Sequence, residues 1–245
     1  MIRASCDAKT FNFQGDKNTF GTLPGLPESG GTCPGATTGP GGCLHVAAGR
    51  CIPDCYALKI CKLRHKVENI LQQNTALLLD ESVDLRAEFI EEFDTFLRVF
   101  NKKKGPKPDK PFYRLFWSGD IPNKRVAVAL AGAIKKFDKK INFWGYTRSF
   151  SIPGVLPPLL KLRNLVLFLS LDPCNEKEGL KAYRKALSRG AKLRIAYMSK
   201  TKPVVPGIRF THCPVDTGVM PLKGACLINC RKCVEHSNVA IWFQS

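Results

Sequence analysis

The sequence contains no long hydrophobic segment. Its longest apolar stretch, Val126 to Ile134, is about half of the roughly eighteen residues that a membrane helix needs. The first residues, Met1 to Cys6, lack the apolar core of a signal peptide. We therefore expect a cytoplasmic protein that has no membrane partner.

Short motifs of several common enzyme classes are also missing. The chain contains no P-loop, no dinucleotide-binding fingerprint and no nucleophile elbow. The sequence thus gives no support to a P-loop NTPase, a Rossmann dehydrogenase or an α/β-hydrolase.

Acidic residues are scarce relative to basic ones. The chain has 20 Asp and Glu against 38 Lys and Arg, which gives a formal net charge of +18. Such an excess attracts polyanions, so we expect DNA or RNA binding that weakens with salt and shows little sequence preference, although a basic solvated surface has the same composition. The basic residues cluster on an expected helix face (Lys181, Arg184, Lys185, Arg189) and in a loop (Lys102, Lys103, Lys104, Lys107, Lys110).

Cysteine, by contrast, is abundant, with 11 in 245 residues. An odd number cannot pair fully into internal disulfides, and such numbers of thiols inside a cell indicate metal binding or redox chemistry. Four of them follow the pattern Cys213-x12-Cys226-x3-Cys230-x2-Cys233. The tight spacings let several sulfurs converge on one centre, either a [4Fe–4S] cluster or a tetrahedral zinc ion. His212 and His236 lie nearby as alternative zinc ligands.

A second, looser group of cysteines lies in the first 61 residues. Residues 30 to 60 are rich in Gly, Pro and Thr, and a metal would order such long loops. We expect a second centre from Cys33, Cys51 and Cys55, with Cys43 or Cys61 as the fourth ligand. Cys6 and Cys174 have no close cysteine in the sequence and are expected to be unliganded.

The middle of the chain alternates between strand and helix patterns. We expect strands at 112–117, 141–146, 165–171 and 192–198, helices at 56–79, 124–139, 156–162 and 176–189, a helix carrying Phe89 to Phe100, and a last strand at 239–243. This series predicts one α/β domain, a partial (β/α) barrel or parallel sheet flanked by Cys-rich loop segments at both ends. Its parts are a Cys-rich region (1–60), helices (61–110), the β/α core (111–205) and a metal-binding segment (206–245).

Polar residues cluster after successive strands, where parallel sheets bind ligands. Ser118 and Gly119 are candidate cofactor-binding residues, and Asp120 could accept bonds from an amine or hydroxyl. Arg114, Asp120 and Arg148 are candidate catalytic residues that would share one mouth with Asp172. The alternatives are a simple Asx turn at Asp120 and a buried ion-pair network.

An ordered series of motifs resembles the phage gene-product-88 family over residues 30 to 235. The motifs are Cys33-Pro34-Gly35-Ala36-Thr37, Cys51-x3-Cys55-Tyr56-Ala57, Arg114-x3-Ser118-Gly119-Asp120, Tyr146-Thr147-Arg148-Ser149, Cys213-Pro214-Val215-Asp216 and Cys226-x3-Cys230-x2-Cys233. The resemblance implies a phage origin, hence the host cytoplasm, and metal binding. This chain differs by an insertion from Gly39 to Arg50 with an extra Cys43, which leaves open which N-terminal thiols are ligands.

The chain also distantly resembles radical S-adenosylmethionine enzymes, which combine a partial barrel with a cluster held by three cysteines at x3 and x2 spacing. Cys226, Cys230 and Cys233 have that spacing but follow the strands, whereas Cys51 and Cys55 precede the strands but have Leu58 in place of a third cysteine. The resemblance implies S-adenosylmethionine as a possible cofactor. We expect an iron–sulfur protein, with an enzyme, a zinc-stabilised nucleic-acid-binding protein and an electron carrier or redox sensor as open alternatives.

Overall fold

The computed structural model describes residues 1–5, 17–48, 53, 55–104, 108–220, 226, 230–235 and 239–244. Within these residues six strands form one sheet in the order β1-β2-β3-β4-β6-β5, and every neighbouring pair is parallel. The strands are β1 (Phe112–Leu115), β2 (Asn142–Thr147), β3 (Leu165–Leu171), β4 (Leu193–Ser199), β5 (Phe210–His212) and β6 (Ala240–Gln244). The predicted α/β fold with a parallel sheet is confirmed.

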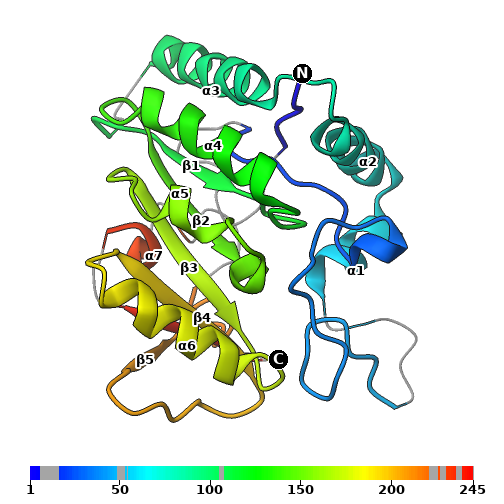
Figure 1. The fold of residues 1–245 in the computed structure, drawn as a ribbon, viewed down its shortest axis with the longest axis vertical. Coiled ribbons are helices and arrows are strands. Elements are labelled where there is room, and N and C mark those ends of the chain that lie inside the picture. Colours follow the sequence, from blue (N-terminus) through cyan, green and yellow to red (C-terminus); the bar gives the residue numbers. More distant parts are fainter. Residues whose placement is uncertain are drawn as a thin grey trace.

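The first four strands are neighbours in chain order, and a helix connects each to the next. These helices are α4 (Lys124–Lys136), α5 (Leu156–Leu159) and α6 (Glu176–Leu187), and all three lie along the same face of the sheet (Figure 1). Strand β6 then lies between β4 and β5, so the order follows the chain only over the first four strands.

The two faces of the sheet are covered differently because successive side chains of a strand alternate between them. On the helix face, residues such as Leu115, Phe143 and Leu167 pack into the main hydrophobic core. The opposite face, here called the inner face, carries Trp144 and Phe168, which pack against the C-terminal segment.

Helices near the N-terminus differ in detail from the expectation for residues 56–79. The predicted single helix is divided into α1 (Tyr56–Leu63) and α2 (His65–Leu79) at Arg64, whose backbone is non-helical (φ −142°, ψ 82°). The helix α3 (Leu85–Lys102) begins where the Asp84 side chain accepts hydrogen bonds from two backbone N–H groups. Shorter elements are η1 (Pro27–Ser29), η2 (Ser149–Ser151) and α7 (Lys232–Glu235).

Two elements were missed in the sequence. Strand β5 lies in a stretch that was expected to be a loop. In addition, residues 18–22 run alongside β1: the backbone N–H groups of Arg114 and Trp117 donate to the carbonyls of Asn18 (2.9 Å) and Phe20 (3.1 Å). This segment brings Phe20 into the core against Phe89 and Phe116. None of the described helices is both long and apolar enough to cross a bilayer.

A buried carboxyl group in α3 predicts how stability depends on pH. Glu92 is 4% exposed and accepts a hydrogen bond of 2.8 Å from the Tyr113 hydroxyl. Burial raises the pKa of Glu92 to about 8 from an ordinary 4.5. The neutral form is favoured in the folded state, so its stabilising contribution is complete below the ordinary pKa and is lost as pH rises through 8.

We therefore expect Glu92→Gln to raise the free energy of unfolding at pH 9 by on the order of 2 kcal/mol, with little change at pH 4. Urea unfolding at the two pH values measures this difference. The matched control is Glu91→Gln, the same change at an exposed neighbour, which should stay within about 0.5 kcal/mol at both. Equal curves for all three proteins at pH 9 would contradict the assignment.

Candidate metal centres

The four C-terminal cysteines line one small cavity. Cys213, Cys226, Cys230 and Cys233 all border a space of about 20 Å³, together with Pro214, Val215, Lys232 and Ile241. This cavity lies on the inner face of the sheet, since Cys213 packs with Phe168 and Ile241 and Cys226 packs with Trp144. The thiols that the sequence grouped by spacing therefore lie together.

Local backbone structure explains why these thiols lie close together. Cys213 directly follows β5, and its N–H donates to the Trp242 carbonyl of β6 at 2.9 Å. Arg231 adopts a left-handed conformation (φ 47°), and its N–H donates to the Cys226 carbonyl at 3.0 Å. A non-glycine residue in this conformation is strained and is held by its surroundings. Here it stands immediately before α7, which carries Cys233.

Side chains on the inner face of the sheet surround this group of thiols. The Tyr146 hydroxyl donates to Cys233 Sγ at 3.5 Å, and Arg194 Nη1 donates to the Cys233 carbonyl at 3.2 Å. The Arg114 guanidinium lies over the rings of Trp144 (5.2 Å) and Tyr146 (5.6 Å). A hydroxyl donor and nearby guanidinium groups are suited to stabilise negative charge on sulfur.

The apolar surroundings disfavour a bare thiolate. Burial raises the pKa of Cys233 to about 11, and the hydrogen bond from Tyr146 opposes this rise. The neighbouring Cys213 and Cys230 raise the pKa of Cys233 further. Thiolates crowded in this way are stabilised by a bound cation.

A separate polar network lies at the carboxyl edge of the sheet, where β1, β2 and β3 end. Asp120 is 3% exposed and accepts hydrogen bonds from Thr147 Oγ1 (2.8 Å) and from the N–H groups of Arg148 (2.6 Å) and Ile121 (2.7 Å). Burial raises the pKa of Asp120, while these hydrogen bonds oppose the rise. Asp120 thus joins the ends of β1 and β2 through long-range hydrogen bonds, and its local contact is with the N–H of the next residue, Ile121.

Arg148 and Asp172 form a buried ion pair at the same edge. Arg148 Nη1 contacts Asp172 Oδ2, and the two side chains are 11% and 0% exposed. Asp172 also accepts a hydrogen bond of 2.6 Å from Thr37 Oγ1, which in turn accepts one of 3.2 Å from the Cys43 N–H. The ion pair therefore attaches the N-terminal loop to the sheet.

Three N-terminal thiols surround this network. Burial raises the pKa of the Cys33 thiol well above its ordinary value, and Asp120, Cys55 and Cys43 raise it further. Burial also raises the pKa of Cys55, with Cys43 adding to the effect. For Arg148, the nearby Cys43 and Asp172 outweigh burial and raise the pKa of its guanidinium. Cys33, Cys43 and Cys55 are therefore electrostatically coupled, and Cys43 also affects Arg148, which pairs with Asp172.

The remaining cysteines are placed differently. Cys61 packs with Leu71 and Trp117 in an apolar cluster, and burial raises its pKa to about 11. Cys174 is isolated in the sequence but lies beside the N-terminal loop, because its Sγ donates to the Pro40 carbonyl at 3.4 Å. Burial raises the pKa of Cys174, and Asp172 and Cys43 add to the rise. Cys6, Cys51 and His236 lie outside the described residues.

Several predicted site residues are engaged in packing. Ser118 Oγ donates to the Thr22 carbonyl at 2.9 Å, and a Cβ on Gly119 (φ 73°) would lie 2.0 Å from Thr22 Oγ1. Arg114 is separated from the Asp120 network and lies on the inner face, where Arg114 Nη2 donates to the Tyr56 hydroxyl at 3.2 Å. The predicted common mouth therefore brings together Asp120, Arg148 and Asp172, but not Arg114.

Neither group of thiols has a preformed metal geometry. Among the described residues, no three His, Cys, Asp or Glu side chains are arranged to hold a metal ion as they stand. Thr37 and Tyr146, which contact the two groups, were not singled out as site residues in the sequence. Tyr146 stood in a quoted motif with Arg148, but β2 ends at Thr147, so the strand's alternation does not fix the direction of Arg148 and gave no signal that separates the two side chains.

The fold and these sites define an α/β protein with a six-stranded parallel sheet, one group of cysteines on its inner face and another at its carboxyl edge. The chain belongs to the family described as Gene product 88, whose profile matches residues 4–235. The resemblance seen in the sequence is thereby confirmed, and the family is a phage protein family.

Two relatives are mycobacteriophage proteins. The Gene 88 protein of Mycobacterium phage D29 is 29% identical over 253 aligned positions, which cover 96% of this chain and 94% of the relative. The Gene 88 protein of Mycobacterium phage L5 is 29% identical over 250 positions, with the same coverage. No solved structure matches the chain.

Proposed function

We propose that this protein binds an iron–sulfur cluster through Cys213, Cys226, Cys230 and Cys233. The observation that carries the proposal is that all four line one cavity on the inner face of the sheet. A site made only of sulfur donors suits an iron–sulfur cluster or zinc. Structural zinc sites typically use two close pairs of ligands, whereas three close cysteines and one distant cysteine are common in cluster proteins.

Zinc is the alternative because the cavity is small. A space of about 20 Å³ accommodates a single ion with little rearrangement. With zinc, the net charge of +18 favours the non-enzymatic nucleic-acid-binding protein as the second candidate function.

Anaerobic purification followed by analysis of iron, acid-labile sulfide and zinc distinguishes the two candidates. We expect a brown protein with a broad absorbance near about 400 nm and equal amounts of iron and sulfide. A colourless protein with one zinc per chain would show that the site holds zinc and would rule out the cluster. A protein that binds neither metal after anaerobic reconstitution would exclude both.

We also propose that Cys33, Cys43 and Cys55 hold a second metal centre at the carboxyl edge of the sheet. Support comes from the mutual effects on thiol pKa and from the position, since parallel sheets bind ligands at this edge. Cys51 stays a further candidate ligand, and Cys61 is disfavoured by its apolar packing. A centre with three thiols has an open coordination position, so an amine or carboxylate ligand such as S-adenosylmethionine is the candidate cofactor.

A cluster held by four cysteines has no open position, so the C-terminal centre is proposed to be structural or to transfer electrons. A redox or radical-type enzymatic activity would therefore have to come from the second centre. Anaerobic reduction with S-adenosylmethionine present tests this function. Formation of 5′-deoxyadenosine that is lost in Cys55→Ala but kept in Cys230→Ala is the expected result. Its absence with both centres loaded would leave electron transfer as the role.

A further inference from the structure

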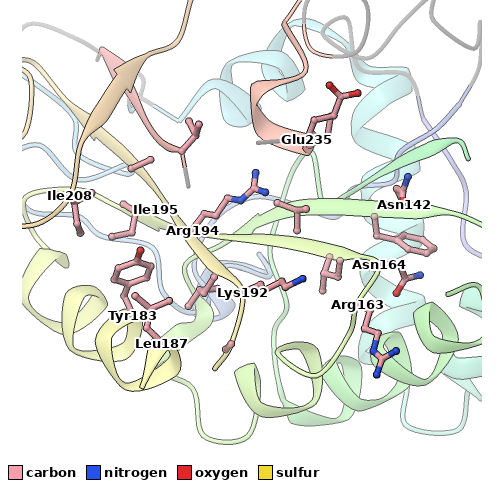
Figure 2. Close-up of a pocket in the computed structure, with 18 of the residues that line it drawn as sticks. Asn142, Arg163, Asn164, Tyr183, Leu187, Lys192, Arg194, Ile195, Ile208 and Glu235 are labelled. Atoms are coloured by element: carbon pink, nitrogen blue, oxygen red, sulfur yellow. The ribbon is translucent and has the colours of Figure 1, made fainter. Parts of the chain in front are cut away.

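A cavity of about 950 Å³ lies at the amino edge of the sheet, where the parallel strands begin (Figure 2). Its lining includes the first residues of β2, β3, β4 and β6, namely Asn142, Leu165, Leu193 and Ala240. The cavity is thus at the opposite end of the strands from Asp120, Arg148 and Asp172. Its size is within the range of about 300–1,000 Å³ that small-molecule pockets occupy.

Four cations line this cavity, and their positions follow from the sequence. Arg163 lies two residues before β3, and Lys192 and Arg209 lie one residue before β4 and β5. Arg194, the fourth, is the second residue of β4. Because parallel strands begin at the same edge, these side chains gather there. Figure 2 shows Arg163, Lys192 and Arg194 near the beginnings of β3 and β4.

The positive charge of the cavity is poorly compensated. Its single acidic lining residue, Glu235, pairs with Arg231 at 2.8 Å. In the part of the chain that the structure describes, Arg163, Lys192 and Arg209 make no ion pair or side-chain hydrogen bond. The loops before β3 (160–164) and β4 (188–192) contain four basic residues and no acidic one. An anion entering the cavity would therefore meet free cations without displacing a carboxylate.

Other lining groups indicate a ligand larger than a simple anion. Asn164 donates through Nδ2 to the carbonyls of Ile134 (3.2 Å) and Ile141 (3.1 Å), and its buried Oδ1 has no partner within the described residues. Asn164 thus ties the start of β3 to α4 and to the start of β2. The partly buried ring of Tyr183 lines the same cavity and offers a surface for stacking.

We infer that this cavity binds the phosphate of a nucleotide, either free or within a nucleic acid strand. Arg163 and Lys192, which precede the neighbouring strands β3 and β4, would contact the phosphate, Arg209 lies further along the same edge, and Tyr183 would stack on the base. Arginine suits this role because its planar guanidinium forms paired hydrogen bonds with phosphate oxygens. The site needs no metal and is independent of both cysteine groups.

The experiment measures binding of two probes, AMP by calorimetry and a fluorescent ten-nucleotide single-stranded DNA by anisotropy, at low salt. We expect Arg163→Gln/Lys192→Gln to weaken binding by at least about tenfold and to lower the salt slope for the DNA by about 1.4, since each lost phosphate contact accounts for about 0.7. The control is Lys200→Gln/Lys202→Gln, which removes the same charge from two exposed residues after β4, at the opposite end of the strands from the cavity. Circular dichroism checks that both variants are folded.

The two probes distinguish the sources of the phosphate. Saturable AMP binding that the DNA displaces supports a free-nucleotide pocket, and DNA binding alone supports a nucleic acid strand. Equal weakening by both double variants would overturn the inference, because it would show diffuse attraction to a basic surface. Binding of neither probe would overturn it as well. Both readouts are independent of metal content, so they are separable from a failure of the iron–sulfur proposal.

Discussion

Replacement of Cys230 by alanine should remove the C-terminal metal. Cys230 lines the same cavity as Cys213, Cys226 and Cys233, so Cys230→Ala leaves three thiols where four are needed to close the site. If the centre is a [4Fe–4S] cluster, the iron content should fall by about four atoms per chain. If it is zinc, one ion per chain should be lost. Metal analysis of protein purified without oxygen measures the change.

The matched control is Cys174→Ala, which removes an exposed thiol that does not line the cavity. It should leave the metal content and the absorbance unchanged. Thermal unfolding gives a second reading, because a metal that binds only the folded chain raises the unfolding temperature and its removal lowers it. Unchanged metal content and unfolding temperature in Cys230→Ala would exclude a shared site for these four cysteines.

The strands could be predicted closely where the local sequence determines them. Residues Leu165 to Leu171 form a continuous apolar run, and β3 has those bounds because a strand buried on both faces needs no alternation. The break at Arg64 could not be predicted, since no glycine or proline stands there. Likewise, residues 18–22 align with β1 through backbone hydrogen bonds, and no side-chain pattern indicates such pairing.

The candidate sites show the same division between local and distant contacts. The cysteines at 226, 230 and 233 are close in sequence, so their grouping was predictable, whereas the contact of Tyr146 with Cys233 joins residues 87 positions apart. The Thr37 contact with Asp172 joins residues 135 positions apart. The sequence suggested that a bound metal orders residues 30 to 60, because this segment has no helix or strand pattern that could order it. The structure adds a second device, the Arg148–Asp172 pair with its link to Thr37.

These two devices predict different results for Arg148→Leu. Removing the guanidinium leaves the Asp172 carboxylate buried without its cation, which should lower the free energy of unfolding by about 3–5 kcal/mol. The loop that carries Thr37 and Cys43 loses the charged anchor of its hydrogen bonds. In hydrogen exchange, residues 30–48 should therefore lose protection while the strands β3 and β4 keep theirs. Lys136→Leu, which breaks a half-exposed pair with Asp94 (3.8 Å), should cost no more than about 1 kcal/mol.

Comparison with Cys55→Ala then separates the two devices. If the ion pair alone orders the loop, residues 30–48 lose protection in Arg148→Leu and keep it in Cys55→Ala. If a metal at the second centre contributes, Cys55→Ala should expose the same residues and release metal, and metal-loaded Arg148→Leu should keep part of the protection. Full protection of residues 30–48 in both variants would contradict both devices. Cys55→Ala therefore tests the second centre, and Arg148→Leu tests the role of the buried network.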